Sequence, residues 1–218
     1  MKLKNGVTFS DKALALLLEF EGFDQPGHWP GVDSGVSIGI GYDLGYTTRA
    51  RFLADWGGRL PAGHVEALSL CVGVKGQAAA RLARNLKAIT IPRAVGRAVF
   101  LERTLPDVEA ETRAVFPGVE RLPQDAQDAL VSLVYNRGGK LVGDTRLEMR
   151  SIRALVPGGN LRAIAAEVRK MKRLWPKYLG LRRRRDAEAA LIEYAAGATP
   201  ASPPYKPALG RKPPEDWV

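Results

Sequence analysis

A short segment near the start of the chain alternates apolar residues with small or polar ones, the period-2 pattern of a strand: Val36, Ile38, Ile40 and Tyr42 alternate with Ser37, Gly39, Gly41 and Asp43. After Thr48 almost the whole pattern is helical. One short strand region followed by many helices predicts an α+β protein. We expect a small N-terminal β lobe and a large helical lobe.

The helical pattern predicts one helix before the strand and nine after it. The first spans about 10–21, and the others span 48–57, 61–70, 75–88, 91–103, 106–116, 123–136, 144–156, 160–172 and 180–196. Gly and Pro separate them, with Pro106 expected to end one helix and start the next. We expect a single domain over 1–197. Residues 198–218 contain six prolines and are expected to form an extended tail.

The composition limits the classes to which this protein can belong. Cys71 is the lone cysteine and only His28 and His64 accompany it, so neither a disulfide nor a structural zinc site is expected. The net charge of +10 predicts attraction to a polyanion, which nucleic acid, an anionic membrane or a bacterial envelope would each provide. The start of the chain lacks a signal-peptide pattern, and no apolar run is long enough for a membrane span. Synthesis in the cytoplasm is expected.

The first predicted helix carries a carboxylate on its apolar face. At helical spacing Glu21 shares a stripe with Leu14, Leu17 and Leu18, whereas Glu19 lies on the other side. Partial burial raises the pKa of a carboxyl group, which is what a general acid requires. The alternatives for Glu21 are a buried ion pair or a position at the frayed end of the helix.

The strand segment carries a hydroxyl and a second carboxylate. Ser37 and Asp43 share one face, with Gly39 and Gly41 between them on that face. Glycines permit a sharp bend and leave room for a bulky ligand to approach the backbone. Asp43 could then come close to Glu21. The alternative is that Asp43 caps the turn through Leu44 and Gly45.

Three motifs together resemble the phage-type lysozymes, muramidases that cut the glycan of bacterial peptidoglycan. They are the FEG at the end of the first helix with the following SIGIGYDLG, the DALVSLVYNRGG of residues 128–139, and the LWPKYLGLRRRRDAEAALIEY of residues 174–194. The YDLG ending is closer to the branch that contains the bacteriocin pesticin and related muramidase effectors. The resemblance implies a lysozyme-like fold with the active-site cleft between the two lobes, and no metal or other cofactor.

The resemblance also implies roles for particular residues. The family's catalytic glutamate falls on Glu21, and its active-site threonine falls on Ser37, where the hydroxyl is kept and the methyl is lost. The second carboxylate falls on Asp43 by the pesticin-like pattern, or on Asp33 by the phage pattern, whose spacing to Ser37 is shorter here than in the family. We prefer Asp43 as base or electrostatic partner.

Four further residues are candidates for substrate binding. Tyr135 and Asn136 could line the sugar cleft, with core packing and a helix C-cap as their respective alternatives. Of the run from Arg182 to Arg185, we expect Arg183 or Arg184 to face the active site, with a solvated helix face as the alternative. Trp175 is expected to anchor the core rather than contact ligand.

The predicted function is hydrolysis of the β-1,4 bond between N-acetylmuramic acid and N-acetylglucosamine in peptidoglycan. A phage endolysin released through a membrane-pore protein and an antibacterial effector paired with an immunity protein both fit, in each case as a monomer acting on the cell wall. The alternatives are a lysozyme-like module that has lost catalysis, and a basic protein that binds envelope polymers or nucleic acid. No nucleic-acid motif is present, so nucleic acid is not an expected partner.

Overall fold

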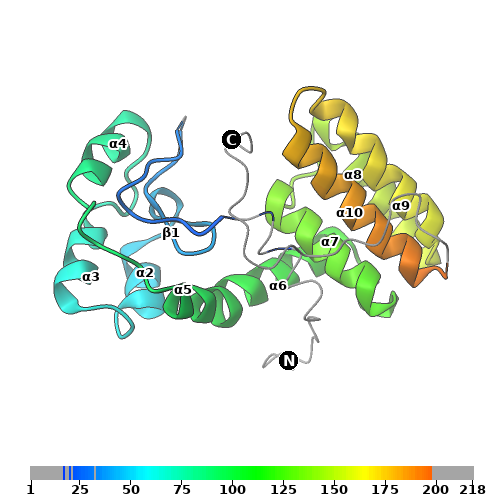
Figure 1. Cartoon of the computed structure of the whole chain (residues 1–218). Coiled ribbons are helices and arrows are strands. Elements are labelled where there is room, and N and C mark those ends of the chain that lie inside the picture. The colour runs from blue at the N-terminus through cyan, green and yellow to red at the C-terminus, as the bar shows by residue number, and fades with distance from the viewer. Residues whose placement is uncertain (1–16, 18–19, 21, 32, 198–218) are drawn as a thin grey trace. The chain divides into compact units, whose positions relative to one another are not determined.

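The computed structural model describes Leu17, Phe20, residues 22–31 and residues 33–197 (Figure 1). Glu21 and the proline-rich residues 198–218 lie outside the described residues. The chain divides into two compact units, with the boundary between Leu105 and Pro106, and Phe20 belongs to the second unit. Each unit has its own hydrophobic core.

The first unit contains the sheet. Its elements are β1 (Ser37–Ile38), β2 (Tyr42–Asp43), a 3₁₀ turn (Leu44–Tyr46), and the helices α2 (Arg49–Trp56), α3 (Ala62–Ser69), α4 (Gly76–Arg84) and α5 (Arg93–Val99). The two strands are antiparallel and joined by a tight turn, in which Gly39 and Gly41 have φ of 62° and 58°. Only glycine adopts these angles without strain. The predicted strand is therefore a hairpin, bent at its glycines as the sequence indicated.

The core of this unit lies beneath the hairpin and its helices. Val36 and Ile38 are fully buried with Phe52 and Trp56 of α2. Tyr42 connects β2 to α2, because its hydroxyl donates to Asp55 Oδ2 at 2.9 Å and its ring packs edge-on against Trp56. The buried Asp55 also accepts from Arg51 at 2.5 Å. These contacts hold the hairpin in a fixed place within the unit.

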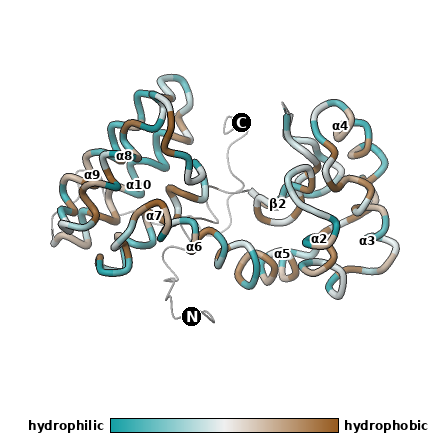
Figure 2. Tube along the Cα trace, turned by 180° about the vertical axis from the view of Figure 1, so that it is seen from behind, coloured by the Kyte–Doolittle hydropathy of each residue, from teal (hydrophilic) through white to brown (hydrophobic). Residues whose placement is uncertain are grey.

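The second unit is helical. It contains most of α6 (Leu105–Val115), followed by α7 (Gln124–Arg137), α8 (Leu147–Leu155), α9 (Leu161–Lys170) and α10 (Leu179–Ala195), with 3₁₀ turns at Val119–Arg121, Asp144–Arg146, Val156–Gly158 and Met171–Leu174. α10 packs against α7 and α9, and α9 packs against α8 (Figure 1). Figure 2 shows hydrophobic residues along α7. In this helix Ala129, Leu130 and Leu133 are fully buried.

The helices after Thr48 are close to those predicted, with one correction, and most of the helix predicted over 10–21 lies outside the described residues. Pro106 was expected to separate two helices, but the backbone stays helical from Arg93 to Val115. A π-helical turn at Phe100–Thr104 precedes the proline, and there the Leu105 N–H donates to the Phe100 carbonyl. Because Pro106 lies in the first turn after this change of pitch, its missing N–H and its ring are accommodated. None of the described helices has the length and apolarity needed to cross a membrane.

Candidate functional site

The hairpin brings two predicted site residues together. Ser37 and Asp43 are directly paired across β1 and β2, so their side chains lie on the same face. Ser37 is 8% exposed, and Asp43 is half-buried. The bend predicted at the glycines thus turns a separation of six residues into a cross-strand neighbour.

Backbone N–H groups hold the Asp43 carboxylate. Asp43 Oδ1 accepts from Gly45 N at 2.7 Å and from Gly35 N at 3.0 Å, and Oδ2 also lies 3.1 Å from Gly35 N. Asp43 is therefore the cap of the turn at Leu44–Tyr46, as the alternative interpretation expected. The positive ends of these N–H groups fix a negative charge beside Ser37, so capping and a catalytic role are compatible.

Gly35 makes this arrangement possible. A Cβ atom on Gly35 would lie 2.3 Å from Asp43 Oδ1 and 2.3 Å from Gly45 N, closer than real Cβ atoms approach. Asp33, the other candidate for the second carboxylate, lies two residues before Gly35, and its side chain is exposed. Its backbone carbonyl accepts from the Tyr46 hydroxyl at 3.2 Å.

The other four predicted residues belong to the second unit. Tyr135 and Asn136 are both half-buried in the last turn of α7, and the C-cap is Gly138, with φ of 66°. The alternative of Asn136 as the C-cap is therefore wrong, because α7 continues to Arg137 and the positive φ that ends it falls on Gly138. Trp175 packs against the core of this unit, as expected.

The arginine run is divided between solvent and core. Arg183 is exposed, whereas Arg184 and Arg185 are 2% and 0% exposed. The Arg184 guanidinium lies 5.7 Å from the centre of the Phe20 ring, next in sequence to Glu21. The interpretation of the run as a solvated face holds for Arg183 but not for Arg184 or Arg185.

A buried network, which the sequence did not predict, holds Arg184. Glu188 is fully buried, and its Oε1 accepts from Ser132 Oγ at 2.7 Å, from Arg185 Nη2 at 2.8 Å and from Arg184 Nε at 3.2 Å. Arg184 Nη2 also donates to the Ser132 carbonyl at 3.1 Å. The i, i+4 spacing of Arg184 and Glu188 was a visible signal, but it does not distinguish this network from an exposed pair.

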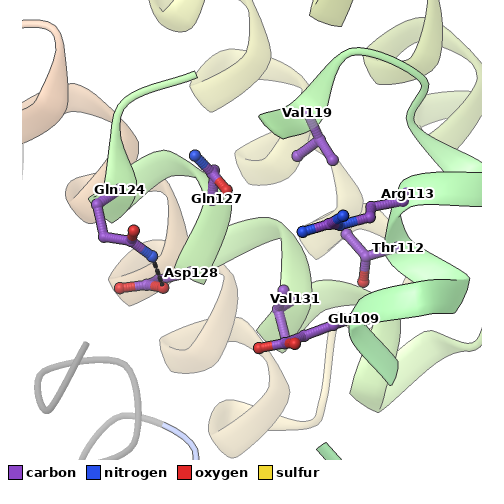
Figure 3. A pocket seen from close by; sticks show the side chains of 8 residues that line it. All are labelled: Glu109, Thr112, Arg113, Val119, Gln124, Gln127, Asp128 and Val131. Atoms are coloured by element: carbon purple, nitrogen blue, oxygen red, sulfur yellow. Dashed lines mark hydrogen bonds between the residues drawn. The ribbon is translucent and has the colours of Figure 1, made fainter. Parts of the chain in front are cut away.

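A second cluster that the sequence did not single out lies between α6 and α7 (Figure 3). It is a hollow of about 290 Å³, open solvent included, lined by Glu109, Thr112, Arg113, Val119, Gln124, Gln127, Asp128 and Val131. Glu109 is 4% exposed, and its Oε1 has no hydrogen-bond partner among the described residues. Asp128 is 1% exposed and accepts from Gln124 Nε2 at 2.7 Å.

Burial raises the pKa of Glu109 to about 7, and the charge of Asp128 adds to the effect while Arg113 opposes it. Glu109 therefore exchanges a proton near neutral pH. The cluster contains none of the predicted site residues.

The fold is thus mostly helical with one small antiparallel sheet, the α+β class of the lysozymes. The family model for phage lysozyme matches residues 60–188, more than half of the chain, and the chain belongs to that family. Membership implies glycoside hydrolase activity on peptidoglycan. No curated protein matches the chain. The matched residues include Tyr135, Asn136, Arg183 and Arg184 and begin after Glu21, Ser37 and Asp43.

Proposed function

We propose that the protein is a muramidase that cuts the β-1,4 bond between N-acetylmuramic acid and N-acetylglucosamine, with Glu21 as the general acid. Glycoside hydrolysis uses one carboxylic acid to protonate the leaving oxygen and one carboxylate to stabilise positive charge or activate water. The family supports the substrate class. The single observation that carries the assignment of roles is the pairing of Ser37 with Asp43.

Asp43 is the negative partner in this proposal. Oδ1 accepts from the N–H groups of Gly35 and Gly45, and Oδ2 accepts from Gly35 N alone, so a position on Oδ2 remains for another donor. These contacts fix the orientation of the carboxylate. Such a group suits electrostatic stabilisation of an oxocarbenium-like transition state, or acceptance of a proton from water at Oδ2. The neighbouring Ser37 hydroxyl can hold that water, because it both donates and accepts.

Arg184 is proposed to orient the end of the first helix. Its guanidinium lies over Phe20, which directly precedes Glu21, and Glu188 and Ser132 hold it rigidly. Tyr135, Asn136 and Arg183 are proposed to bind the sugar chain and its peptide carboxylates. Asp33 is not given a chemical role, since it is exposed and no described contact holds its carboxylate.

We also propose a place in the pesticin-like branch of muramidases, on the strength of the YDLG sequence at residues 42–45. In that branch the protein acts on the cell wall as an antibacterial effector, and an immunity protein that blocks the site is the expected partner. Lysis that needs a co-expressed phage pore protein, and that no neighbouring gene product inhibits, would instead make the protein an endolysin.

Product analysis tests the bond specificity. Purified peptidoglycan is digested, the products are reduced with borohydride, and the fragments are identified by mass spectrometry. A muramidase leaves reduced N-acetylmuramic acid at the new ends. Reduced N-acetylglucosamine, or cleavage in the peptide stems, would overturn the proposal. The anomeric configuration measured at early times separates inversion, which needs carboxyl groups about 6.5–9.5 Å apart, from retention.

A further inference from the structure

We propose that the segment Lys75–Arg97 is a docking surface for a phosphate-bearing anionic polymer attached to the cell wall, such as poly(glycerol phosphate). We call it the basic segment. The choice of a wall polymer rests on the proposed function, which places the protein at peptidoglycan. The cation surface itself is argued from the first unit alone.

The basic segment has charge of a single sign. Between Glu66 and Glu102 the chain contains no acidic residue and six basic ones, which are Lys75, Arg81, Arg84, Lys87, Arg93 and Arg97. All six are exposed. Within the described residues, no ion pair joins any of them to a carboxylate, although other cations of the same unit, such as Arg51 and Arg59, are paired.

The helix α4 presents two of these cations away from the core. Ala79 and Ala83 are buried on one side of α4, and Arg81 and Arg84 project from the other. Side chains three residues apart on a helix have Cβ atoms about 5–6 Å apart, so the two guanidinium groups can contact neighbouring phosphates of one flexible chain. Lys87 lies three residues after the last residue of α4 and extends the surface toward Gly27.

The arginine run at the other end of the chain does not offer a comparable surface. Arg184 and Arg185 are buried against Glu188, and Arg182 donates to the Lys172 carbonyl at 3.2 Å. Lys172 and Arg169 in the same region are paired with Asp186 and Glu193. The basic segment therefore supplies six positive charges to the net value of +10 without an acidic residue between them.

The chemistry of the surface favours a phosphate polymer over single-stranded nucleic acid. Nucleic-acid grooves combine cations with exposed aromatic rings on which bases stack. Among the described residues of this unit, Tyr46 is the large aromatic side chain most open to solvent, and the Lys75 ammonium covers its ring at 3.6 Å from the centre. A phosphate polymer, which binds through its charges and needs no ring for stacking, therefore fits this surface better than single-stranded nucleic acid does.

The test compares two triple variants with the same change of net charge. Arg81→Gln/Arg84→Gln/Lys87→Gln alters the basic segment, and Lys140→Gln/Arg162→Gln/Lys177→Gln alters exposed cations of the other unit. Binding is measured by cosedimentation with cell walls that carry poly(glycerol phosphate), and with the same walls after hydrofluoric acid has removed it. Fluorescent polymer is titrated over a range of salt concentrations.

We expect the first variant to bind intact walls about tenfold more weakly and to show a flatter salt dependence, because fewer counterions are released. The second variant should bind within about twofold of the unaltered protein, and stripped walls should bind all three proteins equally weakly. Hydrolysis of stripped walls should be unchanged in both variants. Equal losses in the two variants, or tighter binding to DNA or to phosphatidylglycerol vesicles than to the polymer, would overturn the proposal. If the protein hydrolyses no peptidoglycan but still binds the polymer through the basic segment, the proposed function is wrong and the docking surface stands.

Discussion

Ser37 and Asp43 are cross-strand neighbours in a hairpin of two-residue strands, and the same carboxylate is held by the N–H groups of Gly35 and Gly45. The hydroxyl and the carboxylate are thus fixed to each other by backbone rather than by flexible side chains. A site built in this way is rigid before substrate arrives, which favours electrostatic catalysis.

Gly35→Ala should disrupt this arrangement. The added methyl would lie 2.3 Å from Asp43 Oδ1, so the carboxylate or the turn must move. We expect a loss of about 1–3 kcal/mol in the free energy of unfolding, as for other overpacked positions, and a large loss of hydrolysis. Gly63→Ala in α3 is the control, because its Cβ meets no atom within 4 Å. It should leave the thermal midpoint unchanged or raise it. Full activity in Gly35→Ala would show that the placement of Asp43 is unimportant.

Asp43→Asn should reduce both stability and activity. An amide oxygen in the place of Oδ1 still accepts from Gly45 N and Gly35 N, but the NH₂ group then replaces Oδ2 and faces the Gly35 N–H as a second donor. Loss of the Oδ2 hydrogen bond and of the negative charge that strengthens the others costs about 1–3 kcal/mol. Asp33→Asn, at an exposed position, should change neither the unfolding curve nor the rate. If hydrolysis is instead lost in Asp33→Asn and kept in Asp43→Asn, the second carboxylate has been assigned to the wrong residue.

Glu109→Gln should change how stability depends on pH. The pKa of Glu109 is raised from 4.5 to about 7 in the folded protein, so the folded state holds the proton more tightly than the unfolded state does. Stability from this group is therefore present below pH 4.5 and is lost as the pH rises to about 7. Relative to the unaltered protein, Glu109→Gln should gain on the order of 2 kcal/mol between pH 5 and pH 8.

Urea unfolding at several pH values measures the effect of Glu109→Gln. Glu120→Gln, which alters an exposed carboxyl in the same unit, is the control. Its free energy of unfolding should change with pH in parallel with that of the unaltered protein. Parallel curves for Glu109→Gln as well would mean that Glu109 is ionised without penalty in the folded state.

Glu188→Ala should unfold the second unit readily. It leaves the buried Arg184 and Arg185 without their carboxylate, and breaking a buried ion pair costs about 3–5 kcal/mol. Glu167→Ala removes a surface pair with Lys170 and should cost less than about 1 kcal/mol. Chemical denaturation compares the two variants, and similar midpoints would contradict the account of the network.

Much of the fold was predictable because helical periodicity and Gly or Pro breaks are local signals. The error at Pro106 arose because a π turn at Phe100–Thr104, with Phe100 and Leu105 buried, lets the helix continue through the proline. The alternative of Asn136 as a C-cap was wrong because α7 continues to Arg137, and the C-cap with positive φ is Gly138, two residues after Asn136.

The bend of the hairpin was predictable from the sequence, whereas most side-chain contacts of the candidate site residues were not. The glycines indicated a sharp bend, and the structure shows that this bend pairs Ser37 with Asp43 across the hairpin. The burial of Arg184 and Arg185 was not readable from a run of four arginines, because Glu188 and Ser132 come from α10 and from α7, far apart in sequence. The raised pKa of Glu109 likewise comes mainly from burial in the folded unit, to which the charge of Asp128 on another helix adds.

The most direct measurement is the rate of hydrolysis of purified peptidoglycan by Glu21→Gln beside Glu19→Gln, with matched circular dichroism spectra and thermal midpoints. Glu21→Gln removes the proposed acid and keeps the shape of the side chain. Loss of a general acid lowers rates by about 10²–10⁴-fold. The account predicts a loss of this size in Glu21→Gln and full activity in Glu19→Gln. Equal activity of the two variants would contradict it and require another residue to protonate the leaving oxygen.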